Sequence, residues 1–276
     1  MNIYAPSRSF PAKVNRAVMP FRLKRNLNIN LDRPLISFTF DDCPKSVVDD
    51  ALPVLEKYGW QSSIYMAMGL CGTTNHLGLH MSESDVVAAY KSGHEIADHT
   101  FDHIDATTVS PELFSANIEK NQARMNALGL PPSQTFAYPF GQLDAGSKRV
   151  VHRKFKGARG IKSRIHRTSA DLNQLNSNRL YSGQSFEDLM RDITKLTENP
   201  GWLTIFTHDV RDNPSDFGCT VDEFKAVVEA VKNIDADVMT VIDAIDVFAR
   251  NHGCMERRGI HSYSHLQTTR RHKGRA

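Results

Sequence analysis

Short apolar runs and longer amphipathic stretches alternate along most of the chain. The apolar runs are partly β-branched and predict buried strands, at residues 35–40, 62–68, 94–97, 134–137, 157–161, 202–207 and 238–240. The amphipathic stretches have helical spacing and predict helices, from 47 to near 59, from 82 or 84 to 90, and over 111–128, 145–155, 185–197, 221–232 and 241–249. Ser110 and Ser185 are the expected N-caps of two of these helices. About seven strand–helix alternations predict an α/β fold with a parallel sheet, and a distorted (β/α) barrel fits best.

Four segments lack this periodicity. Residues 69–80 are rich in glycine and histidine and residues 162–184 are polar, so we expect both to be loops. Residues 1–33 are expected to form a partly ordered N-terminal extension, and residues 253–276 a disordered basic tail. The segment between these two ends, 34–252, contains both loops. It is long and apolar enough to form one domain around a single core.

Charge and cysteine content change this picture little. The formal net charge is +3, and the surplus of Lys and Arg lies near the two ends. We interpret these ends as solvated tails, with contact to nucleic acid, anionic polymer or membrane as the alternative. The four cysteines include no C-x-x-C pair, which favours a reducing compartment. No apolar run near the N-terminus is long enough for a signal peptide or a membrane span, so we expect a cytoplasmic protein.

Two adjacent carboxylates, Asp41 and Asp42, directly follow the strand predicted at 35–40. In a parallel barrel the reactive groups gather where strands end and loops begin. Adjacent carboxylates repel each other, so such a pair needs a proton or a cation, and a metal ion would supply one. The alternative is a pair of helix-capping residues before Pro44.

Two histidines, His99 and His103, follow the strand predicted at 94–97. Histidines four residues apart on one helix face can bind the same metal ion. The spacing alone is weak, because the chain has 12 histidines. His76 and His80 share it within a loop, where we interpret them as surface residues, and a third pair lies in the basic tail. Only the pair at 99 and 103 follows a predicted strand.

A third feature, His208, ends the strand predicted at 202–207, a position suited to a general acid or base, although a structural histidine would look the same. One carboxylate and two imidazoles together make a three-ligand site with open positions. Such a set suits Zn²⁺, with Co²⁺, Ni²⁺ or Fe²⁺ as alternatives. The second carboxylate and the remaining histidine could then serve as base and acid.

These motifs, in this order, resemble those of the polysaccharide deacetylases, the NodB-like carbohydrate esterase family 4. The resemblance covers about residues 34–250 and rests on four segments, 39–42, 99–103, 136–141 and His208. The form of the segment 136–141 is most similar to deacetylases of exopolysaccharide and adhesin synthesis. The resemblance implies a distorted barrel and a catalytic domain over 34–252 that removes acetyl groups from sugars in a metal-dependent reaction.

Carried over by motif, the resemblance assigns Asp41 as general base and His208 as general acid. It assigns Asp42, His99 and His103 as ligands of a divalent metal, with zinc expected first. In the segment 136–141, the backbone N–H near Phe140 would help to bind the oxyanion, and the neighbouring Tyr138 would contact substrate.

The sequence also departs from the family pattern. The family often has Arg where Ala137 stands, so another group must orient Asp41, and Arg159 or Arg164 could do so. Asp171 could replace the usual Asp that tunes the acid histidine. Cys43 replaces a common Gly, and we interpret it as a small turn residue.

The substrate implied is an acetylated amino-sugar oligomer or polymer, or its precursor. Alternatives are an O-acetyl sugar, a small acetylated amine, or an inactive barrel that binds glycan. We expect no specific nucleic acid partner and a peripheral contact with membrane-bound polysaccharide machinery, whereas the sequence does not indicate an oligomeric state.

Overall fold

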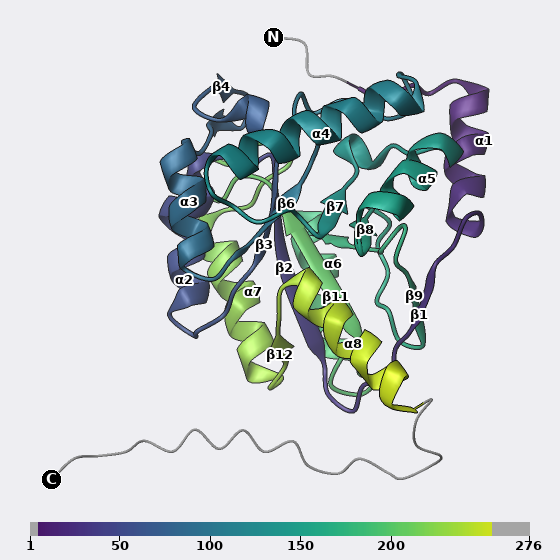
Figure 1. Ribbon diagram of the computed structural model, residues 1–276. Helices are drawn as coiled ribbons and strands as arrows, with labels where there is room; N and C mark the ends of the chain where they lie inside the picture. The colour runs from purple at the N-terminus through teal and green to yellow at the C-terminus, as the bar shows by residue number, and fades with distance from the viewer. Residues whose placement is uncertain (1–4, 256–276) are drawn as a thin grey trace, which may run out of the picture.

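The computed structural model describes residues 5–255, and side chains up to residue 250. Within this part of the chain, eight parallel strands form one sheet in the order β10-β11-β2-β3-β6-β7-β8, with β12 also paired to β2. The strands are β2 (Leu35–Asp41), β3 (Ser63–Met66), β6 (Glu95–Asp98), β7 (Thr135–Ala137), β8 (Gly157–Arg159), β10 (Asn178–Arg179), β11 (Trp202–Thr207) and β12 (Asp237–Val238). The sheet curls into an incomplete barrel, with helices around it (Figure 1), which confirms the predicted distorted (β/α) barrel.

Strand β2 pairs with three other strands of the sheet. One edge of it pairs with β11 over six residues, while the other edge pairs first with β12 and then with β3. All seven residues of β2 are buried, as expected for a parallel strand that is covered on both faces. Between β8 and β10 the sheet is interrupted, although Arg159 and Leu175 still form an isolated parallel bridge there.

Helices cover the outside of the sheet (Figure 1). They are α1 (Phe10–Val18), α2 (Leu52–Glu56), α3 (Glu83–Lys91), α4 (Pro111–Ala127), α5 (Ala145–Lys154), α6 (Gln184–Lys195), α7 (Val221–Asn233) and α8 (Val241–Met255). A short π-helix, Val47–Ala51, precedes α2. The side chains of Ser82 and Ser110 cap α3 and α4 as predicted. The N-cap of α6 is Gly183 rather than Ser185, and α8 extends beyond residue 249.

The segments expected to be loops contain short strands that the sequence did not predict. Residues 69–80 include the hairpin of β4 (Thr74–Asn75) and β5 (Gly78–Leu79). Residues 162–184 include β10 and also β9 (Ser169–Asp171), which pairs antiparallel with β1 (Asn26–Asn28) of the N-terminal extension. Strands of two or three residues show no measurable periodicity, and the β1–β9 pair depends on contacts between distant parts of the chain.

Two further observations concern the ends of the chain. Helix α1, which the sequence did not predict, begins after Ser9, whose side chain accepts a hydrogen bond from the backbone N–H of Ala12. The basic tail was predicted to be disordered over residues 253–276. Residues 253–255 are instead the end of α8, and residues 256–276 lie outside the described residues. Over residues 5–255, no helix combines the length and apolar character needed to cross a membrane.

Candidate metal centre and catalytic site

The ends of β2 and β6 bring one carboxylate and two imidazoles together. Asp42 follows β2, and His99 directly follows β6. Nε2 of His103 lies 3.1 Å from Oδ1 of Asp42, and Nε2 of His99 lies 3.5 Å from the same oxygen. One possible ligand atom from each of the three residues lies within 4.8 Å of the others. The structure therefore brings together the three residues that the sequence predicted as metal ligands.

The chemistry of these three groups fits a cation. Nδ1 of His99 lies 2.8 Å from the carbonyl oxygen of Ala137, so we place the proton on Nδ1 and a lone pair on Nε2. Oδ1 of Asp42 is buried and has no hydrogen-bond donor among the described residues. A lone pair and a carboxylate oxygen thus face each other without a proton between them, which is the arrangement that a divalent metal satisfies.

Burial and nearby charges keep His99 and Asp42 in the ionisation states that bind a metal ion. Burial lowers the pKa of His99 to about 4, although Asp41 opposes this shift, so the imidazole is neutral at pH 7. Burial alone would raise the pKa of Asp42, but the charges of His103 and His99 outweigh it and lower this pKa to about 2. A neutral imidazole and an ionised carboxylate are the forms that coordinate metal ions.

The histidine pair lies on a turn rather than on the predicted helix face. Within 99–103 the backbone is not helical, and φ is positive at Thr100 (61°) and His103 (50°). The side chain of Asp98 supports the turn by accepting a hydrogen bond from the N–H of Thr100 at 2.8 Å. The spacing of four residues was therefore informative for a different reason, since a tight turn brings both rings back to one point.

Positive φ angles are concentrated around this site. Of the seven non-glycine residues with positive φ among the described residues, five belong to the site or its immediate neighbours: Asp42, Cys43, Thr100, His103 and Phe140. Such conformations are unfavourable for residues with a Cβ and tend to occur at functional sites. The barrel therefore holds a strained backbone where the strands end.

The conformation of Cys43 agrees with its interpretation as a turn residue. Its φ of 56° is favourable for glycine, which explains why glycine suits this position. The thiol is fully buried, and its Sγ lies 3.5 Å from the carbonyl oxygen of Tyr65. Burial, with the nearby charges of Asp41 and Asp42, raises the pKa of this thiol well above its usual value. The thiol therefore stays protonated, which makes it a poor metal ligand.

A buried ion pair fixes the second carboxylate. Nη2 of Arg159, the last residue of β8, contacts Oδ1 of Asp41, and both side chains are almost fully buried. The guanidinium carbon lies 4.8 Å from the ring centroid of Phe206 and 5.1 Å from that of Tyr65. Burial by itself would raise the pKa of Asp41, but Arg159, with smaller effects of His99 and His208, lowers it below the ordinary value. Asp41 is therefore ionised at neutral pH.

The position of Arg159 explains how a cation reaches Asp41 when residue 137 is alanine. Ala137 on β7 and Arg159 on β8 are direct partners in the parallel register. Partners in parallel strands lie side by side and direct their side chains to the same face of the sheet. The guanidinium thus comes from the neighbouring strand, at the same level of the barrel. Arg164, the other candidate, lines a different cavity.

His208 completes the site from the end of β11. Its Nδ1 lies 3.1 Å from the carbonyl oxygen of Phe217, so Nε2 is the nitrogen left to exchange a proton with a substrate. Its charge contributes to lowering the pKa of both Asp41 and Asp42, so it lies near both carboxylates. The rings of Phe217 and Tyr181 lie 5.8 and 6.0 Å from the imidazole. Sequence reasoning did not identify either aromatic residue.

The two residues assigned a role in the segment 136–141, Phe140 and Tyr138, lie in different surroundings. The ring of Phe140 packs 4.3 Å from that of His103, next to the proposed ligands. Tyr138 instead packs in the core, its hydroxyl donates to the carbonyl of Asn173 at 3.1 Å, and its N–H donates to the carbonyl of Arg159 at 3.1 Å. Both polar groups of Tyr138 therefore have internal partners, so the structure does not support direct substrate contact by this residue.

Asp171 also lies away from the position predicted for it. One of its oxygens makes an ion pair with Nζ of Lys148 at 2.8 Å. The other accepts hydrogen bonds from the backbone N–H groups of Arg25 and Asn173. The carboxylate thus joins the N-terminal segment to α5 and β9 rather than tuning His208. Asp171 lies in β9, a short strand that the sequence did not predict.

His80 is buried, contrary to its interpretation as a surface residue. The hairpin of β4 and β5 turns it inward, where it is 1% exposed and forms an isolated antiparallel β-bridge with Pro44. Its Nδ1 lies 3.3 Å from the carbonyl oxygen of Thr73, and its Nε2 is buried without a hydrogen-bond partner among the described residues. Its charge acts on the pKa of Asp42. His76, by contrast, is exposed as expected.

Comparisons with known proteins agree with this geometry. The sequence profile of the polysaccharide deacetylase family matches residues 28–154. The chain is 26% identical over 118 residues to the putative polysaccharide deacetylase YxkH of Bacillus subtilis. This match covers 43% of the chain and 41% of that protein, so it spans about two fifths of the relative's length.

Solved structures show the same fold. One is the family 4 domain of a multidomain xylanase from the hindgut metagenome of Trinervitermes trinervoides, with TM-score 0.55, 20% identity, and coverage of 80% of this chain and 92% of that one. Another is a family 4 carbohydrate esterase from Streptomyces lividans, with TM-score 0.51, 15% identity, and coverage of 74% and 91%. Residues 28–154 thus match the polysaccharide deacetylase family, and the described chain has the barrel fold of these carbohydrate esterase family 4 structures.

Proposed function

We propose that this protein is a metal-dependent hydrolase that removes N-acetyl groups from an amino-sugar polysaccharide or its precursor, in exopolysaccharide or adhesin synthesis. One observation carries the proposal. Three groups suited to a divalent cation, Asp42, His99 and His103, lie beside a carboxylate that is ionised and fixed by Arg159. Ligands, base and acid thus lie close together, as hydrolysis of an amide requires.

The donor set of one carboxylate and two imidazoles favours Zn²⁺, with Co²⁺, Ni²⁺ or Fe²⁺ as alternatives. When bound, such a metal polarises the acetyl carbonyl and lowers the pKa of water. Asp41 accepts the proton of the attacking water, because Arg159 keeps it ionised and holds it in one orientation. The backbone N–H near Phe140, on the turn that packs against His103, helps to bind the oxyanion.

His208 supplies the proton that the leaving nitrogen needs. An amine leaves poorly as an anion, so C–N cleavage requires a general acid. The hydrogen bond between Nδ1 of His208 and the carbonyl of Phe217 fixes the ring and leaves Nε2 for this transfer. The rings of Tyr181 and Phe217 beside it offer an apolar wall for the sugar.

Acetate release from N-acetylglucosamine oligomers by the zinc- or cobalt-loaded protein tests the proposal. Asp41→Asn should abolish release while zinc content stays unchanged, since this residue acts as base. Asp102→Asn is the matched control, because Asp102 lies between the two histidines but is exposed and pairs with Lys120. Equal activity of the Asp41→Asn variant would exclude the catalytic role.

The substrate panel separates this proposal from its alternatives. Faster release from O-acetylated xylan than from any N-acetylated oligomer or exopolysaccharide would favour an esterase that uses the same residues. Absence of turnover on every substrate, with glycan binding retained, would favour an inactive barrel. The missing Arg at position 137 motivated that last alternative, and the ion pair of Arg159 with Asp41 removes this motive.

A further inference from the structure

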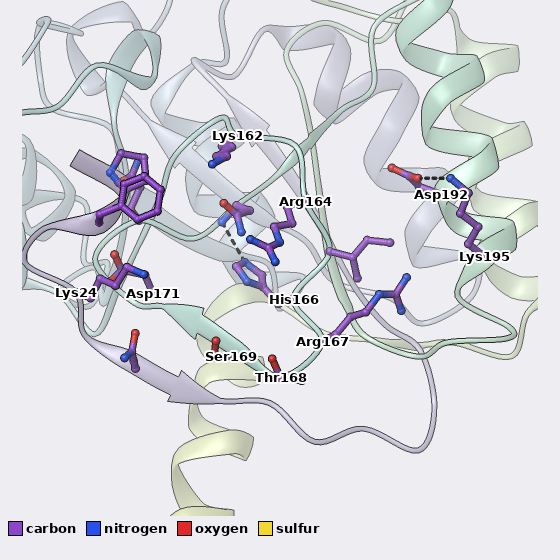
Figure 2. Close-up of a pocket in the computed structure, with 16 residues that line it drawn as sticks. Lys24, Lys162, Arg164, His166, Arg167, Thr168, Ser169, Asp171, Asp192 and Lys195 are labelled. Atoms are coloured by element: carbon purple, nitrogen blue, oxygen red, sulfur yellow. Dashed lines mark hydrogen bonds and ion pairs between the residues drawn. The ribbon is translucent and has the colours of Figure 1, made fainter. Parts of the chain in front are cut away.

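A cavity of about 500 Å³ lies among residues that do not belong to the metal centre. It lies between the N-terminal segment before β1, the loop from β8 to β9, and the end of α6 (Figure 2). None of the residues that line it belongs to the proposed metal site, and none lies within residues 28–154, the part that matches the family profile. The cavity is therefore built from segments outside the part of the chain that matches the family profile.

The cavity is lined mainly by positive charge. Its basic side chains are Lys24, Lys162, Arg164, Arg167 and Lys195, which Figure 2 shows on three separate segments. Two carboxylates also line it, and each already has a cationic partner. Asp171 pairs with Lys148 at 2.8 Å, and Asp192 pairs with Lys195 at 3.3 Å.

Four cations of the cavity thus remain without a carboxylate. Lys24, Lys162, Arg164 and Arg167 form no ion pair with any residue that the structure describes. Cations that face a common space repel one another unless an anion lies between them. Arginine and lysine together are the usual partners of phosphate, because guanidinium N–H groups and ammonium groups form charge-assisted hydrogen bonds with its oxygens.

The loop that carries three of these cations is fixed rather than free. The backbones of His166 and Trp202 exchange two hydrogen bonds, of 2.9 and 2.7 Å. The buried ring of His166 accepts a further bond from the N–H of Asn176 at 3.0 Å. Nη1 of Arg167 donates to the carbonyl of Pro200 at 3.2 Å. A fixed loop loses less entropy when it binds an anion, so the cations are prearranged.

An aromatic ring and several amides lie beside the cations. Phe21 lines the cavity and is 73% exposed, with the ammonium of Lys24 lying 5.6 Å from its ring centroid. Amide side chains come from Asn26, Gln174 and Asn176. An exposed ring can pack against the apolar face of a sugar, and amides can bond to its hydroxyls.

We propose that this cavity binds a phosphate-bearing sugar. The phosphate contacts Lys162, Arg164 and Arg167, and the sugar packs against Phe21 with its hydroxyls toward the amides. The phosphate group could belong to a free sugar phosphate or to the diphosphate of a carrier-linked sugar, and these share the same chemistry. The proposal is independent of the deacetylase reaction, because binding is measured without turnover.

Isothermal titration of the full chain with four small probes tests the proposal. The probes are inorganic phosphate, N-acetylglucosamine, N-acetylglucosamine 1-phosphate and UDP-N-acetylglucosamine. We expect the sugar phosphates to bind more tightly than inorganic phosphate, and the neutral sugar not to bind at this cavity. Tighter binding of the monophosphate assigns a free sugar phosphate, and tighter binding of the diphosphate assigns a carrier-linked sugar.

Two double variants test whether the sugar phosphates bind at this cavity. Lys162→Gln with Arg164→Gln removes two exposed cations and should raise the Kd by at least about tenfold, the effect of losing one charge-assisted hydrogen bond. The matched control is Arg149→Gln with Arg153→Gln, which removes the same charge from the exposed surface of α5 and should leave the Kd within about twofold. Acetate release should be unchanged in both, because neither pair belongs to the metal site.

Three results would overturn the proposal. The first is failure of both sugar phosphates to bind. The second is an equal loss of affinity in the control pair, which would indicate a general effect of surface charge. The third is inorganic phosphate binding as tightly as the sugar phosphates, since this would show that no sugar is recognised.

Discussion

The pair of Arg159 and Asp41 allows the sharpest test of the site. Arg159→Gln keeps much of the side-chain volume but removes the charge from a position that is 1% exposed. Asp41 then remains a carboxylate in a buried environment without its main counter-charge. We expect lower activity, lower stability and an altered response of both to pH.

The magnitude follows from burial. Removing one partner of a buried ion pair costs about 3–5 kcal/mol, because the other charge is left unpaired. Contacts of the guanidinium with the rings of Tyr65 and Phe206 are lost as well. A base that is poorly oriented or protonated should lower kcat/KM by roughly 10²- to 10⁴-fold, the usual contribution of general base catalysis.

The pH dependence has a defined sign. In the wild type the pKa of Asp41 is below its ordinary value, so its contribution to stability is present above the ordinary pKa and is lost as pH falls through the folded-state pKa. Without Arg159, burial dominates and raises this pKa. The variant should therefore gain stability as pH falls from 7 toward the raised pKa, and the acid limb of its kcat/KM profile should move to higher pH.

Two further variants separate position from charge. Arg159→Lys keeps the charge but not the guanidinium, which also bonds to Gly160 and Ser177 through Nη1, so it should retain the wild-type sign of the pH dependence with lower activity. Ala137→Arg in the Arg159→Gln background returns a guanidinium from β7 and should restore at least about tenfold of the lost kcat/KM. Wild-type activity and an unchanged acid limb in Arg159→Gln, with full metal content, would refute the idea that Arg159 orients the base.

Three other variants test separate parts of the structure. His99→Ala should weaken zinc binding at least tenfold in competition with a chelator, whereas exposed His76→Ala should not, and equal affinity in both would remove His99 from the ligand set. His80→Leu removes a buried, unpartnered Nε2 and should leave the free energy of unfolding unchanged or raise it by about 1 kcal/mol. A large destabilisation would show that this nitrogen has a structural partner. Burial lowers the pKa of His166 to about 4, so this residue should contribute a loss of up to about 3 kcal/mol of stability as pH falls from 6.5 to 4. Denaturant unfolding of His166→Gln should show a smaller loss, and an identical slope would contradict this.

The barrel could be predicted where the local sequence pattern shows which residues are buried and where a helix begins and ends. Strands β2 and β11 are apolar runs that are buried on both faces, and α4 is framed by Ser110 and Gly129, so local pattern and final structure agree. The pair β1–β9 could not be predicted, because it joins Leu27 to Ala170 across about half of the chain. No local rule records such a pairing when each strand has three residues.

The candidate site could likewise be predicted only in part. The positions of Asp42, His99 and His103 follow from strand ends, and these are marked in the sequence by the change from apolar to polar residues. His80 was misjudged because the two-residue strands that turn it inward have no sequence signal. Tyr138 was expected to contact substrate because it lies close to Phe140 in the sequence. Nearby residues in a turn can direct their side chains to different sides, and the side chain of Tyr138 packs in the core.

Arg159 shows why an apparently missing residue need not mean a missing function. The chemistry requires a cation next to Asp41 and does not specify which strand supplies it. In a parallel barrel, residues paired in register on neighbouring strands reach the same interior level, and Ala137 and Arg159 are such a pair. Alanine at 137 leaves room in the interior cluster that it forms with Tyr65 and Ala97, and the guanidinium of Arg159 lies against Tyr65. The absence of Arg at position 137 is thus compensated one strand away, and it is no argument for an inactive barrel.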